Sequence, residues 1–581
     1  MAHSRLQILA SYIRPHWRKS ALGIGALLVV NALGVYIPLL IRSGVDTLQT
    51  VTDFRPVALQ ASLIFVLASV MWVIRMVSRI LIFGVGRQVE FDLKQQIFEH
   101  LLTLEPAYFS SSRIGDLINR ATSDIDNIRR LVGFAVLSLA NTIFAYSLTL
   151  PVMLGINFRL TVLSVSVYPL MLILVKSFSG QLQTQQLEVQ ERLSDLSDLI
   201  QEDMSGISLI KIYAQEENER RAFAERNRDL LDANLILART RNILFPLLGG
   251  IASLSLLILI ALGDRSIATG ELSVGDFVAL VLYIERLVFP TALLGFTITA
   301  YQRGEVSVDR IETILSVKPA IQNHHDPLAL PVPVKGWLSA RHLSYSYPEA
   351  ATQALEDVEF VIRPGETVAV VGPIGSGKST LANALPRLLD IGIDSLFLDG
   401  QDITQVRLDE LRGAIAYVPQ ESFLFSTTIR ENIRYGNPLA EQSEIETAAK
   451  LAQIHSEILN FPQQYDTVVG ERGITLSGGQ RQRTALARAL LTDAQVLILD
   501  DALSSVDNQT ATEILHNLTT GTQRKTVLFI SHQMSAAATA DRILVMDEGH
   551  IAQEGTHQIL VEQLGLYRSL WNQHKLKELV T

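Results

Sequence analysis

Long runs of uncharged residues in the first half of the chain limit its fold more than any other feature. Residues 20–41 read SALGIGALLVVNALGVYIPLLI and contain no charged side chain. At 1.5 Å per residue, such a helix crosses the roughly 30 Å of hydrocarbon in a bilayer. The run is longer than the core of a signal peptide, and no small-residue cleavage site follows it. It therefore predicts a transmembrane helix.

Five further segments share this character. Residues 56–74, 131–158, 160–175 and 242–263 are uncharged, and residues 277–302 are apolar except for Glu285 and Arg286. We therefore expect a transmembrane domain over residues 1–325 with six helices, at about 20–42, 56–86, 131–157, 159–179, 242–263 and 276–302.

The charges around the first helix predict its orientation. Four basic residues and no acidic residue precede it, whereas Asp46, Asp53 and Arg55 follow it. Because basic loops stay cytoplasmic, the N-terminus is predicted to be inside, and six crossings return the chain to the cytoplasm. The predicted location is the plasma (inner) membrane, and the lack of a targeting extension is typical of a prokaryotic protein.

The predicted loops differ in length on the two sides. The outward links are short: residues 42–55, the Asn157–Arg159 corner and residues 264–276. The inward links, about 75–130 and 176–241, are long and charged, with apolar residues at helical spacing. They predict helical hairpins that touch a cytoplasmic domain; the alternative is two solvated hairpins.

Composition supports one membrane part joined to one soluble part. Apolar residues make up 48% of the 581 residues and charged residues only 19%. The net charge of −10 gives no basic surplus for nucleic acid. The absence of cysteine excludes disulfides, zinc-thiolate sites and thiol catalysis.

A proline-marked linker, predicted at residues 326–337, precedes a change in pattern. Over residues 338–581, short β-rich runs alternate with helical runs, which predicts an α/β P-loop nucleotide-binding domain. Within it, the strand ETVAVVG leads into G-P-I-G-S-G-K-S and then a helix, the context in which G-x-x-x-x-G-K-[ST] binds phosphate.

The residue types of this loop suit ATP. Gly375 and Gly377 let backbone N–H groups turn toward phosphate oxygens, Lys378 reaches the β- and γ-phosphates, and the Ser379 hydroxyl ligates Mg²⁺. The alternative is a chance glycine loop before a helix. The predicted ATP-binding residues of the loop are Gly372, Pro373, Ile374, Gly375, Ser376, Gly377, Lys378, Ser379 and Thr380.

A second element is VLILDDALSSVD, residues 496–507, in which Asp500 and Asp501 end an apolar strand. Ligands of open α/β sheets lie at the carboxyl ends of strands. One acid there can hold Mg²⁺ through water, and the next can orient an attacking water. Alone, such a run is often only a strand entering a turn.

Between these elements lies LSGGQRQR, residues 476–483, and with it the chain resembles the ABC transporter superfamily. The six helices with two long inward loops resemble the type I exporter arrangement. The resemblance implies a half-transporter, active as a dimer, that exports amphipathic or lipid-like compounds by alternating access. It implies ATP hydrolysis with Mg²⁺.

The resemblance also implies roles for single residues. Tyr347 matches the aromatic that stacks on adenine, Gln420 the glutamine near Mg²⁺ and the attacking water, and His532 the histidine that holds the γ-phosphate. Asp507 matches the loop that links the two ATP sites. The signature residues, which contact ATP on the opposite subunit, are Leu476, Ser477, Gly478, Gly479 and Gln480. The inferred catalytic residues are Asp501, His532 and Gln420, and the inferred Mg²⁺ residues are Ser379, Gln420 and Asp500. The inward loops resemble coupling loops, with contact points near Ser111–Asp116 and Ile207–Tyr213.

One departure from the family stands at Asp501, where relatives usually carry glutamate as the general base. Aspartate is one methylene, about 1.5 Å, shorter, and a misplacement of that size can lower the rate about a hundredfold. The alternative is neutral change, with backbone adjustment that restores reach. Heterodimeric exporters pair such a weakened site with a competent one, so we expect a heterodimer ahead of a homodimer.

The cargo is less well specified. The few charges of the membrane half suit an amphipathic or lipid-like cargo, and Glu285 would attract a cationic drug or pair with an arginine of another helix. Two other functions stay open: a homodimeric lipid flippase and an ATP-gated channel or regulator. The six spans argue against a soluble ABC protein acting on ribosomes or DNA. An importer is disfavoured because importers usually keep the two domains on separate chains.

Overall fold

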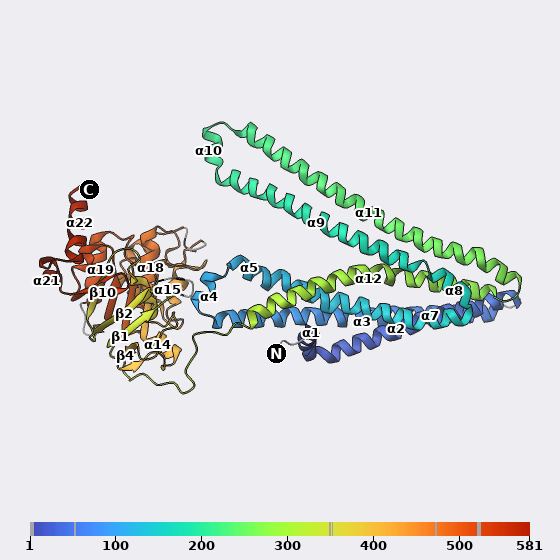
Figure 1. Cartoon of the computed structure of the whole chain (residues 1–581), viewed down its shortest axis with the longest axis horizontal. Helices are drawn as coiled ribbons and strands as arrows, with labels where there is room; N and C mark the ends of the chain where they lie inside the picture. Colours follow the sequence, from blue (N-terminus) through green and yellow to red (C-terminus); the bar gives the residue numbers. More distant parts are fainter. Residues whose placement is uncertain are drawn as a thin grey trace. The chain divides into compact units, whose positions relative to one another are not determined.

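The computed structural model describes residues 5–50, 54–347, 350, 352–470, 473, 475–519 and 524–580. Asp53, used above for the orientation, lies outside the described residues. The chain forms two compact units, one of Met1–Leu102 with Ser112–Val317 and one of Thr103–Ser111 with Lys318–Thr581 (Figure 1). The short segment Thr103–Ser111 therefore belongs to the second unit although it interrupts the first.

Helices form the N-terminal part of the chain. They are α1 (Arg5–Ile13), α2 (Trp17–Thr50), α3 (Phe54–Thr103), α4 (Pro106–Ser111), α5 (Ile114–Asn119), α6 (Ile125–Arg130), α7 (Val136–Ile156), α8 (Phe158–Val165), α9 (Tyr168–Ser205), α10 (Ile207–Ile212), α11 (Glu216–Ala268) and α12 (Val274–Leu315). A 3₁₀ turn at Arg14–His16 and π-helical turns at Arg120–Asp124 and Leu131–Ala135 link some of them.

Six stretches of these helices are long and apolar enough to cross a membrane, which confirms the six predicted spans. They are Gln7–Leu48, Arg55–Thr103, Ile114–Ile156, Phe158–Ser205, Glu216–Ala268 and Val274–Leu315. Each helix continues past its apolar segment. The 53 residues of α11, for example, extend about 80 Å at 1.5 Å per residue, far more than the hydrocarbon core needs.

The predicted inward hairpins are continuations of these membrane helices. In Figure 1, α9 and α11 run side by side and diverge from α12 toward the short helix α10 that joins them. Val189 of α9 packs against Ala233 and Leu237 of α11 in a small buried cluster. At the other end, Asn157 turns the chain sharply by capping α8, since its Oδ1 accepts the Leu160 N–H at 3.0 Å.

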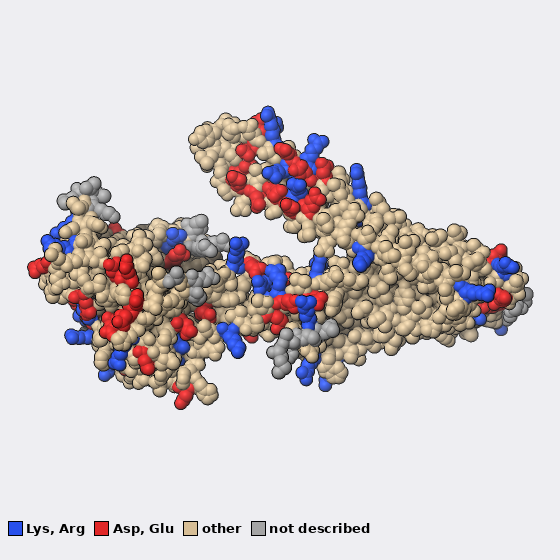
Figure 2. Space-filling model, viewed as in Figure 1, with Lys and Arg blue, Asp and Glu red and all other residues tan. Residues whose placement is uncertain are grey.

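Charge is distributed unevenly along the first unit. On the face drawn in Figure 2, a band of the helical bundle shows no charged side chain, and charged groups gather on either side of it. Such a band is the surface that hydrocarbon tolerates, because an unpaired charge in lipid is costly.

The second unit contains two sheets, one of four strands in the order β2-β1-β4-β5 and one of six in the order β10-β9-β3-β8-β7-β6. The strands are β1 (Leu338–Tyr345), β2 (Leu355–Ile362), β3 (Thr367–Val371), β4 (Leu396–Leu398), β5 (Gln401–Asp402), β6 (Ile415–Val418), β7 (Val496–Asp500), β8 (Thr526–Ile530), β9 (Arg542–Asp547) and β10 (His550–Gly555). In the larger sheet, β9, β3, β8, β7 and β6 are parallel, and β10 pairs with β9 in the antiparallel sense. The predicted combination of membrane helices with an α/β domain is confirmed.

Beyond Lys318, the second unit also contains ten α-helices among the described residues, several of which pack on the larger sheet. They are α13 (Lys378–Ala384), α14 (Leu408–Ala414), α15 (Ile429–Arg434), α16 (Gln442–Leu451), α17 (His455–Leu459), α18 (Gly478–Leu490), α19 (Asn508–Thr519), α20 (Met534–Ala537), α21 (His557–Glu562) and α22 (Leu566–Val580).

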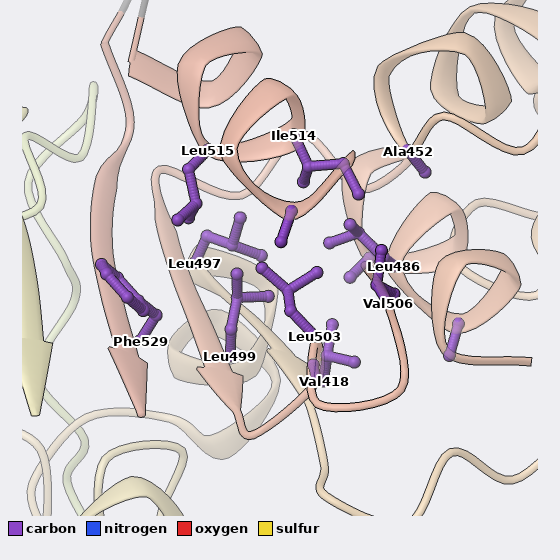
Figure 3. Close-up of a cluster of buried hydrophobic side chains, with 14 of the residues drawn as sticks. Val418, Ala452, Leu486, Leu497, Leu499, Leu503, Val506, Ile514, Leu515 and Phe529 are labelled. Carbon is purple, nitrogen blue, oxygen red and sulfur yellow. The ribbon is translucent and has the colours of Figure 1, made fainter. Parts of the chain in front are cut away.

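Strand β7 shows how the core positions the site. Leu497 and Leu499 point into a cluster with Leu486 of α18 and Ile514 of α19 (Figure 3), while Ile498 joins the cluster on the opposite face. Because both faces are buried, the strand reads as an unbroken apolar run. Its carboxyl end therefore delivers the acidic pair to the edge where β3 also ends.

Candidate functional site

The phosphate loop links the buried strand β3 to the start of α13. Gly375 and Gly377 have φ angles of +85° and +93°, a left-handed backbone that L side chains rarely adopt. A Cβ on Gly377 would also overlap the carbonyl oxygen of Ala354. Glycine is thus required for the loop to curl ahead of the helix, as the motif predicted.

Lys378 lies at the centre of this loop and is only 6% exposed. Its Nζ donates to the carbonyl oxygens of Gly372 at 2.9 Å and Pro373 at 2.5 Å. Burial lowers the pKa of Lys378, and the carboxylates of Asp500 and Asp501 oppose that shift. The ammonium group of Lys378 is thus bound by neutral carbonyl oxygens, inside a loop that is shaped by two glycines with left-handed backbone. Phosphate oxygens could replace those carbonyls as acceptors, so the loop fits phosphate.

Asp500 and Ser379 meet beside the loop. Ser379 Oγ donates to Asp500 Oδ1 at 3.0 Å, and the Tyr417 hydroxyl lies 3.4 Å from Asp500 Oδ2 and donates to Asn383 at 2.8 Å. Burial raises the pKa of Asp500, and the hydrogen bonds from Ser379 and Tyr417 counter that shift. A hydroxyl and a carboxylate are oxygen ligands of the kind that Mg²⁺ prefers, so these two predicted Mg²⁺ residues fit the ion.

Asp501 follows in a left-handed conformation with φ +49° and is 8% exposed. Its N–H donates to the Ile530 carbonyl at 3.1 Å, and its own carbonyl accepts from Ser504 Oγ at 2.9 Å and Ser504 N at 3.2 Å. Within the described part of the chain, no group donates a hydrogen bond to its carboxylate. The backbone of Asp501 is therefore held on both sides, while its carboxylate is not tied to a donor among the described residues.

The signature segment begins α18. Ser477 forms a reciprocal cap with Gln480: Ser477 Oγ accepts the Gln480 N–H at 3.2 Å, and Gln480 Oε1 accepts the Ser477 N–H at 2.9 Å. A Cβ on Gly479 would lie 2.7 Å from the Ser505 carbonyl oxygen. The two glycines thus let the turn after β7 pass close to the helix start.

Sequence reasoning missed Gln482, which ties α18 to that turn. Its Nε2 donates to Ser504 Oγ at 3.0 Å, and its Oε1 accepts the Ser505 N–H at 2.9 Å. The signal was available, since a glutamine two residues past the signature falls on the buried side of the helix.

The remaining predicted residues lie around the loop with looser connections. The Tyr347 hydroxyl is 3.3 Å from Thr380 Oγ1, and His532 lines a cavity of about 140 Å³ together with Gly372 and α22. Gln420 and Asp507 are exposed, and Asp507 caps α19 by accepting the Thr510 N–H at 2.9 Å, which lowers the pKa of Asp507. The participation of α22 in the His532 cavity was not foreseen.

Protein-family models match two parts of this chain. Residues 21–291 match the ABC transporter transmembrane region, and residues 355–504 match the ABC transporter model. The two matches fall on the helical unit and on the part of the second unit that holds the phosphate loop, the signature segment and the acidic pair.

Similar proteins cover nearly the whole chain. The multidrug resistance-like ATP-binding protein MdlA of Escherichia coli is 34% identical over 573 residues, 98% of this chain and 96% of that protein. The probable multidrug resistance ABC transporter ATP-binding/permease protein YheI of Bacillus subtilis is 32% identical, covering 99% and 98%. An ATP-dependent lipid A-core flippase of Syntrophus aciditrophicus is 30% identical, covering 98% and 94%. Among solved structures, a bacterial Atm1-family ABC exporter with ATP bound superposes with a TM-score of 0.78 at 27% identity, covering 96% of this chain and 99% of that one.

Proposed function

Because this chain belongs to the ABC transporter family, we propose that it is one half of a dimeric exporter, paired with a different half-transporter, and that its own ATP site is slow. The chain is a multi-pass membrane protein and an ATPase coupled to export of the multidrug or lipid-flippase type, with ATP and Mg²⁺. The proposal adds three points. One subunit has a slow ATP site and its partner a competent one, transport proceeds by alternating access, and the N-terminus and the nucleotide-binding domain are cytoplasmic.

The proposal of slow ATP hydrolysis at this site rests on one observation, the fixed backbone of Asp501. Restoring the reach of the missing methylene requires the main chain to advance by about 1.5 Å. Three hydrogen bonds oppose that movement. The Asp501 N–H donates to the Ile530 carbonyl, and the Asp501 carbonyl accepts from both the N–H and the hydroxyl of Ser504. Backbone adjustment, the alternative that would rescue hydrolysis, is therefore disfavoured.

The residues of the loop would perform separate tasks on ATP. Lys378 exchanges the carbonyls of Gly372 and Pro373 for phosphate oxygens, which pair its charge. Ser379 and Asp500 would hold Mg²⁺, which offsets phosphate charge when bound. Asp501 orients water from too great a distance. The intact signature from Leu476 to Gln480 would complete the competent site of a partner that carries glutamate.

Two short helices would carry the coupling. Segment Thr103–Ser111 forms part of the second unit, and Glu105 within it accepts the Ala320 N–H at 3.1 Å. Ser111, one end of the predicted contact Ser111–Asp116, belongs to this segment, whereas Asp116 pairs with Arg120 and Arg310 in the first unit. At the second hairpin, Leu209, Ile212 and Tyr213 expose 60%, 73% and 68% of their surface. Such an apolar tip suits the partner's nucleotide domain.

The test is the composition of the working complex. A tagged chain would be purified from its native membrane, and its mass and ATPase rate compared with those of the chain expressed alone. We expect a second half-transporter with glutamate at the position of Asp501, and slow hydrolysis without it. A homodimer that hydrolyses ATP at about 10 s⁻¹, the usual enzyme rate, would overturn the proposal.

A homodimeric lipid flippase is the second candidate. It is favoured by the 30% identity to a lipid A-core flippase over 570 residues. Lipid movement by the chain alone in vesicles would select this function over the heterodimer.

A further inference from the structure

A cavity of about 320 Å³ lies within the first unit, between α2, α3, α7 and α12. Three arginines line it, Arg75 and Arg79 from α3 and Arg286 from α12, together with a single acidic residue, Glu285. The other lining residues are apolar or neutral, so the charged groups of the cavity sum to about +2.

Arg286 contacts the central part of the first predicted span. Its Nη2 donates to the carbonyl oxygen of Asn31 at 3.2 Å and to Asn31 Oδ1 at 3.1 Å. Asn31 stands at the centre of the uncharged run 20–41 and also donates to Asn141 Oδ1 at 3.1 Å. A Cβ on Gly34 would overlap the guanidinium, so glycine there is what admits the arginine. The charge is thus held deep in the bundle by neutral partners.

Among the described residues, these arginines have no negatively charged partner. Within the residues that the structure describes, no ion pair involves Arg75, Arg79 or Arg286. The buried Nε of Arg286 also has no hydrogen-bond acceptor there. Glu285 is exposed and also forms no ion pair among the described residues, so the predicted pairing of Glu285 with an arginine is not observed. Like charges in a low-dielectric site repel, and an anion from outside the chain would relieve that repulsion.

A larger cavity of about 580 Å³ continues the first, since Phe134 and Leu293 line both. Its wall combines apolar side chains, such as Leu182 and Phe296, with Arg130, Arg241 and Arg303. Arg130 pairs with Asp126 at 2.7 Å, whereas Arg241 and Arg303 form no ion pair among the described residues. The two cavities therefore provide apolar wall and unpaired positive charge, with one carboxylate between them.

We infer that the two cavities take an amphiphile with an anionic head, such as a phosphate, whose apolar tail lies along the larger cavity. The inference rests on the proposed export function for its biological sense, but the binding itself does not require ATP. The arginine fork suits planar or tetrahedral oxyanions through paired N–H donors. A cationic drug is disfavoured because it would meet three guanidinium groups and one carboxylate.

Binding to the purified full chain without nucleotide tests this inference. The probes are two fluorescent twelve-carbon amphiphiles with the same tail, one with a phosphate head and one with a trimethylammonium head, followed by fluorescence anisotropy. We expect the phosphate probe to bind at least tenfold more tightly. Arg75→Gln combined with Arg79→Gln should remove that preference without loss of folding, because neither side chain donates to an oxygen of the described chain.

Further variants separate the causes. Arg286→Gln should weaken the phosphate probe about tenfold and leave the ammonium probe unchanged, whereas Arg228→Gln, an exposed arginine of α11 outside both cavities, should change neither. Equal binding of both heads, or a preference for ammonium, would overturn the inference. If inorganic phosphate displaced the phosphate probe as strongly as the unlabelled amphiphile does, the inference that an apolar tail lies along the larger cavity would be overturned. These experiments measure binding and not transport. They therefore test the inference even if the chain proves not to export a compound or not to form a heterodimer.

Discussion

Lengthening the side chain at Asp501 should restore hydrolysis. The Asp501→Glu substitution adds about 1.5 Å of reach from a backbone that is fixed by Ile530 and Ser504. If the shortfall costs about a hundredfold in rate, the barrier falls by about 2.7 kcal/mol when it is removed. ATP affinity should stay the same, since Lys378, Ser379 and Asp500 are unaltered.

The assay is phosphate release by the chain expressed alone in lipid nanodiscs at saturating ATP, with turnover expressed per dimer counted by mass photometry. Asp501→Asn serves as the matched control, because it keeps the shape and removes the charge; we expect it to be no faster than the wild type. ATP binding would be measured separately by calorimetry. An Asp501→Glu rate within twofold of the wild type would refute the argument from reach.

Three further predictions concern other sites. Gly34→Ala should destabilise the first unit by about 1–3 kcal/mol, seen as a lower unfolding temperature in detergent, because the methyl group would displace Arg286; Gly25→Ala on the same helix, with nothing within 4 Å of its Cβ, should have no effect. Gly479→Ala should slow ATP hydrolysis by the assembled complex, because the new Cβ lies 2.7 Å from the Ser505 carbonyl oxygen and would displace the turn after β7; unchanged hydrolysis would contradict this packing. ATP affinity should be full below the lowered pKa of Lys378 and fall as pH rises through it, because only the ammonium pairs with phosphate; calorimetry between pH 7 and 10 would detect this, and Lys378→Arg should give a flat profile.

Much of the architecture was accessible from local pattern. An uncharged run such as 20–41 has few alternatives to a membrane helix, because charge and unsatisfied backbone are both costly in hydrocarbon. The phosphate loop was equally readable, since left-handed backbone at Gly375 and Gly377 requires glycine wherever the loop occurs. The order of loop, signature segment and acidic strand then pointed to the family.

Pattern did not predict the contacts between distant segments. The role of Gln482 depends on the turn at Ser504 and Ser505 that packs against α18, and the cavity at His532 depends on α22. The alternative that Glu285 pairs with an arginine of another helix also depended on tertiary structure. Arg75 and Arg79 of α3 line the same cavity as Glu285, yet among the described residues no ion pair forms between them.

The amino-acid sequence alone therefore determined six spans, a nucleotide fold and the chemistry of the phosphate loop, because each depends on composition or backbone over a few neighbouring residues. Tertiary structure alone decided how firmly the Asp501 backbone is held and which charges face one another inside the bundle. Those properties arise from side chains far apart in the chain, such as Asn31 with Arg286 and Asp501 with Ile530, whose meeting no local period encodes.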